Sequence, residues 1–266
     1  MRKNKDIKVA FFDIDWTLYD HGQNPSKFTK SAVKAIDKLR ANGIKVILCT
    51  ARAYASMLDI HTLEELNVDG VITHNGGFIF IENNKVRTSE LDPKYLMPLI
   101  ERANELGIVL EIFTEFGAFM TNKANEFVDR YHNFWKEEYN EVKEFVPGVD
   151  HCFSALVYAP EEYDEKLFTK DFPYAHVRFF ETAVDVTIEP FYKGDGIKMA
   201  LDYFGFKKEE AIAFGDSRDD VTMFNEVGIS VAMGNGADCA KEAATYVTYK
   251  IHHHGVRHAL KHFKLI

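Results

Sequence analysis

The chain has 266 residues, of which 46% are hydrophobic and 27% are charged. This length is enough for two compact domains with packed cores. The formal net charge of -9 argues against a nucleic-acid-binding surface, because the phosphates of DNA and RNA require a basic face. No stretch reaches the roughly 18 consecutive apolar residues of a membrane span. The three separated cysteines predict neither a disulfide framework nor a zinc site, so we expect a cytoplasmic protein without nucleic-acid or membrane partners.

The first eighty residues alternate between short apolar runs and amphipathic segments. Nearly continuous apolar runs of four to eight residues are typical of strands that are buried on both faces of a sheet. Strands that alternate with helices form right-handed crossovers and a parallel sheet. We predict strands at 7–12, 44–49 and 71–73, and helices at 29–42 and 52–66.

The pattern changes from about residue 83 to residue 190. Helices here are followed by pairs of closely spaced strands, with candidate hairpin turns at Gly117 and Thr182. This order predicts an α+β unit with an antiparallel sheet. The expected helices are 93–106, 125–139 and 161–170, and the expected strands are 109–114, 118–121, 154–158, 176–180 and 184–189.

After residue 194 the first pattern returns. We therefore predict an α/β fold with a parallel-sheet core, formed by residues 1–82 and 191–266, and an α+β cap inserted at 83–190. The elements expected in the last part are helices at 196–204, 221–226 and 238–244, and strands at 211–214, 229–232 and 246–248.

Two of the predicted core strands end in acidic residues. Asp13 and Asp15 follow the strand at 7–12, and Asp216, Asp219 and Asp220 follow the strand at 211–214. Open α/β sheets bind ligands at the carboxyl ends of their strands, and clustered carboxylates repel one another unless a cation is present. A solvated turn, or an acidic helix N-terminus favoured by the helix dipole, would explain each motif separately.

Two further positions suit the binding of a phosphate group. Thr50 ends the strand at 44–49, and Ala51 and Arg52 open the next predicted helix, where free N–H groups can hold an anion. A plain N-cap is the alternative there. Lys193 lies where the core resumes and can supply a positive charge to a phosphoryl group, although most lysines are simply solvated.

The order and placement of these motifs resemble the haloacid dehalogenase-like superfamily, and within it the Cof-type sugar phosphatases of subfamily IIB, which carry a large C2-type cap. The resemblance covers essentially the whole chain and implies a Rossmann-like catalytic core with an inserted substrate-specificity domain. The sequences that carry it are FFDIDWTL at 11–18, ITHNGG at 72–77, ILCTAR at 47–52, YKGDGI at 192–197, AFGDSRDDVTMF at 213–224, SVAMGNG at 230–236 and HHHGV at 252–256.

The resemblance implies a phosphatase that hydrolyses small phosphate monoesters, such as sugar phosphates, with Mg²⁺ as cofactor. Asp13 would attack phosphorus and become an aspartyl phosphate, while Asp15 would protonate the leaving group and later accept a proton from water. For that role we expect the pKa of Asp15 to be raised. The implied phosphate-binding residues are Thr50, Ala51, Lys193 and Asp219, and the implied metal ligands are Asp13, Asp15 through its backbone carbonyl, Asp216 and Asp220.

The sequence departs from the family pattern in three places. Trp16 stands where glycine is usual, Asp219 replaces an asparagine, and His254 precedes Gly255 where an acidic residue is common. We interpret His252, His253 and His254 as a solvated loop rather than a metal site, because consecutive side chains point in different directions.

Two other functions use the same residues. One is a phosphotransferase that passes the phosphoryl group to another hydroxyl. The other is a non-catalytic signalling domain that stores phosphate on Asp13, but the inserted unit and the placement of Asp15 argue against it. The sequence predicts neither the oligomeric state nor the particular ester.

Overall fold

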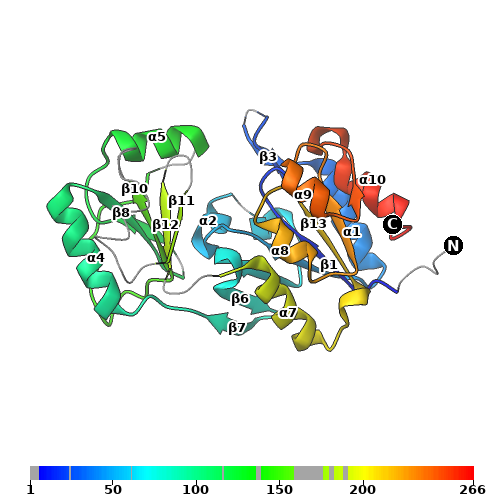
Figure 1. The fold of residues 1–266 in the computed structure, drawn as a ribbon, viewed down its shortest axis with the longest axis horizontal. Helices are drawn as coiled ribbons and strands as arrows, with labels where there is room; N and C mark the ends of the chain where they lie inside the picture. Colours follow the sequence, from blue (N-terminus) through cyan, green and yellow to red (C-terminus); the bar gives the residue numbers. More distant parts are fainter. Residues whose placement is uncertain are drawn as a thin grey trace. The chain divides into compact units, whose positions relative to one another are not determined.

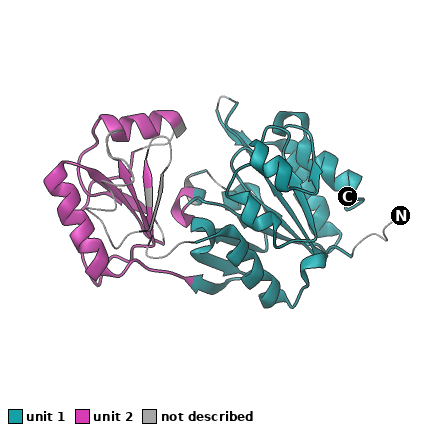
Figure 2. Ribbon diagram, in the orientation of Figure 1, with its two compact units in different colours: residues 1–52, 57–87, 191–266 teal, residues 53–56, 88–190 magenta. Residues whose placement is uncertain are grey.

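The structure, a computed structural model, describes residues 6–23, 25–60, 62–115, 117–135, 139–158, 176–179, 183–187 and 191–266. The chain divides into two compact units (Figure 2). The first unit comprises residues 1–52, 57–87 and 191–266, and the second comprises residues 53–56 and 88–190.

The first unit is built on an eight-stranded sheet in the order β15-β14-β13-β1-β4-β5-β6-β7 (Figure 1). Every pairing from β15 to β5 is parallel, and β6 pairs antiparallel with β5. This confirms the predicted α/β class with a parallel core sheet. The strands are β1 (Val9–Phe12), β4 (Lys45–Cys49), β5 (Gly70–Thr73), β6 (Phe78–Ile81), β7 (Asn84–Thr88), β13 (Ala211–Gly215), β14 (Ile229–Ala232) and β15 (Tyr246–Val247).

Helices cover both faces of this sheet (Figure 1). Apolar residues of α7, α8 and α9 share one core with Val9 and Phe11 of β1. Successive strand residues point to opposite faces, so Ala10 and Phe12 point to the side covered by α1 and α10. The helices along these segments are α1 (Lys30–Ala41), α2 (Tyr54–Asp59), α3 (Thr62–Glu65), α7 (Lys193–Phe204), α8 (Asp220–Phe224), α9 (Asp238–Ala243) and α10 (Gly255–His262), with 3-10 turns η1 (His74–Gly76), η2 (Lys208–Glu210) and η3 (Ile251–His253).

The pairing of β1 with β13 fixes the register at the centre of the sheet. Phe12 lies opposite Phe214, and their rings stack with centroids 4.7 Å apart. The backbone N–H of Asp13 donates to the carbonyl of Phe214 at 2.9 Å, which extends the ladder by one residue. The two strands therefore end side by side.

The hairpin formed by β6 and β7 was not predicted. Its turn residues Glu82 and Asn83 have φ angles of 48° and 67°, the paired positive values of a two-residue hairpin turn. The hairpin adds two strands to the core sheet, so the first unit extends to Arg87 and not only to residue 82.

The single helix predicted at 52–66 is wrong in its bounds. The chain forms the shorter helices α2 and α3 there, and α2 begins only at Tyr54. The backbone N–H of Arg52 donates instead to the hydroxyl of Thr50 at 3.1 Å, which turns the chain before the helix starts.

The second unit has a five-stranded antiparallel sheet in the order β11-β12-β10-β8-β9, as the sequence predicts. Helix α4 matches the predicted range, with Asp92 capping its start and Gly107 ending it at a φ of 68°. The predicted helix at 161–170 and the turn at Thr182 lie outside the described residues. The elements are α4 (Pro93–Leu106), α5 (Glu126–Trp135), β8 (Val109–Phe113), β9 (Ala118–Met120), β10 (Ser154–Tyr158), β11 (His176–Phe179) and β12 (Val184–Thr187).

None of the helices in the described part of the chain has the length and apolar character needed to span a bilayer.

Candidate active site

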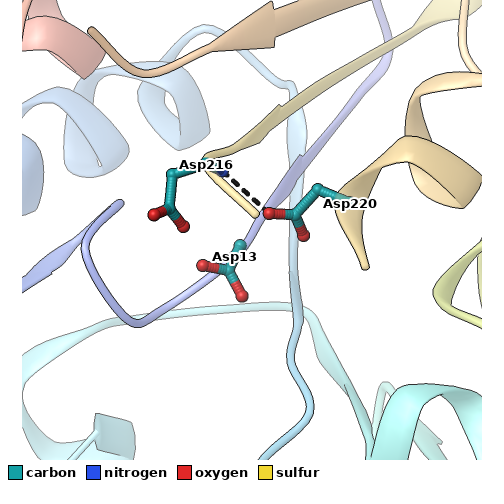
Figure 3. Close-up of side chains that lie close together, drawn as sticks. All are labelled: Asp13, Asp216 and Asp220. Carbon is teal, nitrogen blue, oxygen red and sulfur yellow. Dashed lines mark hydrogen bonds between the residues drawn. The ribbon is translucent and has the colours of Figure 1, made fainter. Parts of the chain in front are cut away.

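Three aspartates converge where β1 and β13 end (Figure 3). Asp13 directly follows β1, Asp216 directly follows β13, and Asp220 is the first residue of α8. Each offers a carboxylate oxygen, and these oxygens lie within 4.8 Å of one another. The parallel pairing of the two strands thus joins acidic motifs that are two hundred residues apart in the sequence.

Lys193 is the cation nearest to this cluster within the described ranges. Its Nζ lies 2.6 Å from Asp13 Oδ1 and 2.6 Å from Asp220 Oδ1. Lys193 is the first residue of α7 and is only 2% exposed. Because one ammonium faces three carboxylates, the ionised cluster keeps a surplus of two negative charges.

The pKa values of the clustered aspartates reflect both their burial and this surplus of negative charge. Burial raises the pKa of Asp13 well above its usual range, and Asp220 and Asp216 add to the shift, although Lys193 opposes it. Burial and the neighbouring Asp220 likewise raise the pKa of Asp216 to about 7. Three clustered carboxylates are the hard oxygen donors that a divalent cation prefers, and such a cation would favour their ionised forms.

Asp220 also anchors the loop that carries Asp216. Its Oδ2 accepts hydrogen bonds from the backbone N–H of Asp216 at 2.8 Å and of Ser217 at 2.9 Å, and from the Ser217 hydroxyl at 3.1 Å. The carboxylate passes close to Gly215, where a Cβ atom would lie 2.3 Å from Asp220 Cγ. Glycine at 215 is therefore required by close packing.

The predicted phosphate-binding residues lie at two places beside the cluster. Thr50 directly follows β4, which is the neighbour of β1 in the sheet, and its side chain is buried. Ala51 is the next residue. Since α2 starts at Tyr54, Ala51 belongs to a loop and not to a helix N-terminus. Asp219 lies in the turn before α8, where its carbonyl accepts a hydrogen bond from Thr222 at 3.0 Å, and it is not among the three clustered carboxylates.

Asp15 has a different set of partners from Asp13. Arg52 binds it in a bidentate manner, with Nε 2.8 Å from Oδ2 and Nη2 2.8 Å from Oδ1. His21 Nε2 lies 2.6 Å from Oδ1. Burial raises the pKa of Asp15, but Arg52 and His21 outweigh it and hold that pKa well below its usual value. The expectation of a raised pKa for Asp15 is therefore wrong for this state.

The backbone conformation at Trp16 is one that glycine adopts more easily than other residues. Its φ is 58°, a left-handed conformation that a side chain makes costly. The backbone is held there by a hydrogen bond from its N–H to the Tyr19 carbonyl and by one from Asn235 to its own carbonyl, both 2.9 Å long. Trp16 is 39% exposed, and its indole contacts the ring of His21.

The ITHNGG segment packs against two site loops. The backbone N–H groups of His74 and Asn75 donate to the carbonyls of Arg52 and Thr50 at 2.9 Å and 3.1 Å. At Gly76, with a φ of 106°, a Cβ atom would lie 2.9 Å from the Tyr192 carbonyl, next to Lys193. This segment thus supports both Thr50 and Lys193. Burial of His74 within it lowers the pKa of that imidazole to about 4.

Sequence reasoning missed the side chains that hold Asp15. Arg52 was noted only for its place at the predicted helix start, and His21 lies in a polar turn that carries no periodic signal. The three consecutive histidines His252, His253 and His254 are exposed, with the first two in the 3-10 turn η3, and His254 contacts Ser31. Within the described ranges, the aspartate cluster is the only group of three or more His, Cys, Asp or Glu side chains that could hold a metal ion.

Comparisons with known proteins agree with this geometry. Residues 10–260 match the family model for haloacid dehalogenase-like hydrolases. The chain belongs to this family. The Bacillus subtilis protein YkrA, whose phosphatase name is provisional, is 29% identical over 98% of this chain and 99% of its own. Phosphoglycolate phosphatase 1 of Saccharolobus solfataricus is 29% identical over 94% of this chain and 93% of its own.

Solved structures place this hydrolase among the Cof-type phosphatases. The subclass IIB sugar phosphatase BT4131 has a TM-score of 0.79 at 26% identity and covers 97% of this chain and 100% of its own. The phosphatase BT1666 from Bacteroides thetaiotaomicron has a TM-score of 0.82 at 26% identity, covering 100% and 98%. The protein is a phosphoric monoester hydrolase of the Cof type.

The contact between Gly215 and Asp220 predicts a stability effect. Gly215→Ala should lower the free energy of unfolding of the hydrolase by about 1–3 kcal/mol, because the added methyl group must displace a buried carboxylate. Urea denaturation measures this change. Gly117→Ala is the matched control, since a Cβ atom there meets nothing within 4 Å. Equal effects of the two substitutions would contradict the role given to Gly215.

The raised pKa of Asp216 predicts that a divalent cation stabilises the hydrolase more at high pH. A folded-state pKa of about 7 lies above the ordinary value of 3.8, so the metal-free protein loses stability as the pH rises between them. The cation binds the ionised form. We expect MgCl₂ to raise the melting temperature by about 5 °C or more at pH 8, and by much less at pH 5.5.

Thermal unfolding with and without MgCl₂, after treatment with EDTA, checks this expectation. Asp216→Asn removes the titrating ligand and should abolish most of the cation-dependent shift. Shifts of the same size at both pH values would contradict the proposed link between cation binding and the ionisation of Asp216.

Proposed function

We propose that this enzyme hydrolyses small phosphate monoesters, such as sugar phosphates, with Mg²⁺ and through an aspartyl phosphate on Asp13. The observation that carries the proposal is the surroundings of Asp13. One carboxylate oxygen is paired with the buried Lys193 at 2.6 Å, and the Asp216 and Asp220 carboxylates lie beside it. A carboxylate becomes an effective nucleophile for phosphorus when positive charge orients it and offsets the charge of the phosphoryl group.

The donor set fits a magnesium ion. Asp13, Asp216 and Asp220 bring carboxylate oxygens together, and the backbone carbonyl of Asp15 completes the proposed ligands. Bound there, Mg²⁺ supplies positive charge that offsets the repulsion between the carboxylates and the substrate. The loop around Asp216 is already held in place by Asp220 Oδ2.

Phosphate binding is assigned to Lys193 and Thr50. Lys193 provides a point charge, and Thr50 provides a hydroxyl at the end of the neighbouring strand β4. The roles of Ala51 and Asp219 in phosphate binding stay predictions. Phosphoryl transfer depends mainly on such positioning and electrostatic stabilisation, and little covalent chemistry is required of the protein.

Asp15 is the proposed general acid and base. With its present partners it is a carboxylate, the form that accepts a proton from the water that cleaves the aspartyl phosphate. For the first step it must carry a proton, and a bound phosphate dianion favours that form because nearby negative charge raises the pKa of a carboxyl group.

The proposal assigns catalysis to the first unit and substrate specificity to the second. Asp13, Asp15, Thr50, Lys193 and Asp216 all belong to the first unit. Residues 88–190 are left for selection of the leaving group, as the resemblance implies. The relatives carry names for different substrates, including phosphoglycolate, so the particular ester must come from a screen.

Removing the nucleophile tests the proposal. Wild-type protein should release phosphate from at least one metabolite ester in a panel with MgCl₂, and EDTA should abolish this release. Asp13→Asn should lower the rate by about a thousandfold or more, because the amide cannot form the covalent intermediate. A colorimetric phosphate assay measures both effects.

The Asp13→Asn protein should remain folded, since the neutral amide has the shape of the protonated carboxyl group that burial favours. Its thermal transition is the control. Phosphate release by Asp13→Asn at the wild-type rate would exclude Asp13 as the nucleophile. Product analysis with added acceptor alcohols separates hydrolysis from phosphotransfer.

A further inference from the structure

The imidazole of His21 lies against the carboxylate to which the proposed function assigns proton transfer. Its Nε2 is 2.6 Å from Asp15 Oδ1. The side chain of His21 is only 10% exposed. A contact shielded from water in this way is less easily exchanged for hydration than an ion pair on an open surface. His21 is therefore part of the surroundings that determine where the Asp15 carboxyl group points.

The backbone that carries His21 is itself held in place. His21 follows β2 (Tyr19–Asp20), which pairs with β3 (Lys27–Phe28). The buried carboxylate of Asp20 accepts hydrogen bonds from the backbone N–H of Gly22 at 3.0 Å and from Gln23 Nε2 at 2.9 Å. The turn after β2 is thus fixed from within.

The ring of His21 is also held in place. Its centroid lies 5.1 Å from that of Tyr19, in an edge-on arrangement, and 5.4 Å from that of Trp16. Aromatic contacts of this kind restrict the orientation of a ring. Trp16, one of the three departures from the family pattern, therefore packs on the histidine that contacts Asp15.

Within the described part of the chain, the donors around Asp15 leave one acceptor position open. Each carboxylate oxygen has two lone pairs. Oδ1 accepts from His21 Nε2 and from Arg52 Nη2, while Oδ2 accepts from Arg52 Nε at 2.8 Å. Among the residues that the structure describes, both positions on Oδ1 and one position on Oδ2 are thus occupied.

We propose that His21, acting together with Arg52, is a positioning residue that makes Asp15 Oδ2 the atom that exchanges the proton. The inference rests on the proposed function. In the first step an oxygen of Asp13 bonds to phosphorus while the P–O bond to the leaving group breaks. The leaving oxygen takes the proton from Asp15 Oδ2, which gives a neutral alcohol, the aspartyl phosphate and an ionised Asp15 still held by the same donors.

Leaving-group dependence tests the inference. An alkyl phosphate needs the proton because its alkoxide is strongly basic, whereas 4-nitrophenyl phosphate needs it little. The value of kcat/KM covers only the steps up to release of the leaving group. We expect His21→Ala to lower kcat/KM at least about tenfold for the alkyl phosphate that wild-type enzyme hydrolyses fastest, and less than about threefold for 4-nitrophenyl phosphate.

The ratio of the two values is measured on one preparation, so partial unfolding cannot change it. His21→Gln places an amide donor near the position of Nε2. It should return the ratio of the two kcat/KM values most of the way to that of the wild-type enzyme. His252→Ala, a change of an exposed histidine on η3, is the matched control and should leave both values unchanged.

Equal losses on both substrates, or no loss on either, would overturn the positioning role. Failure of His21→Gln to restore the ratio would also count against it. These outcomes differ from failure of the proposed function, which would appear as an absence of Asp13-dependent phosphate release from the wild-type enzyme on every ester.

Discussion

The arrangement of the site depends on the parallel pairing of β1 with β13, which brings three carboxylates together at one end of the sheet. Repulsion between them is relieved only in part by Lys193, whose ammonium contacts Asp13 and Asp220. Burial, together with the remaining negative charge, raises the pKa values of Asp13 and Asp216. A bound divalent cation would remove the same repulsion. The repulsion that destabilises the metal-free cluster would therefore also favour the binding of a cation and, through the cation, of a phosphate group.

Close backbone packing makes this arrangement possible. Gly215 lets the Asp220 carboxylate approach the end of β13, where it binds the N–H groups of the following loop. Gly76 lets the turn after β5 lie against Tyr192, beside Lys193. At both positions the missing side chain is replaced by another part of the chain, so an added methyl group has to displace it. The charged groups are thus held by contacts that were made before any ligand binds, which is the condition for electrostatic preorganisation.

Much of this could be predicted from sequence, and the limits follow from the kind of signal used. Apolar runs followed by acidic residues identified β1 and β13 and placed Asp13 and Asp216 at their ends, because strand polarity alone decides where those ends meet. Helix α4 was predicted to the residue since its capping signals are local. The β6–β7 hairpin and the late start of α2 were missed because they depend on a turn and on one side-chain hydrogen bond at Thr50. The contacts of His21 and Arg52 with Asp15 have no periodic pattern at all.

The two carboxylates of the Asp13-Ile14-Asp15 motif would face the same crevice if β1 simply continued, and would then share their neighbours. The structure separates them, because β1 ends at Phe12 and a tight turn follows, in which the N–H groups of Leu18 and Tyr19 both donate to the Ile14 carbonyl. Asp13 is left with Lys193 and the acidic cluster, whereas Asp15 is left with Arg52 and His21. Burial raises the pKa of Asp13, and Asp220, Asp216 and Asp15 add to that shift, whereas Arg52 and His21 lower the pKa of Asp15 against the effect of burial. Two carboxylates whose pKa values are shifted in opposite directions can take different parts in one reaction, one bonding to phosphorus and the other exchanging protons.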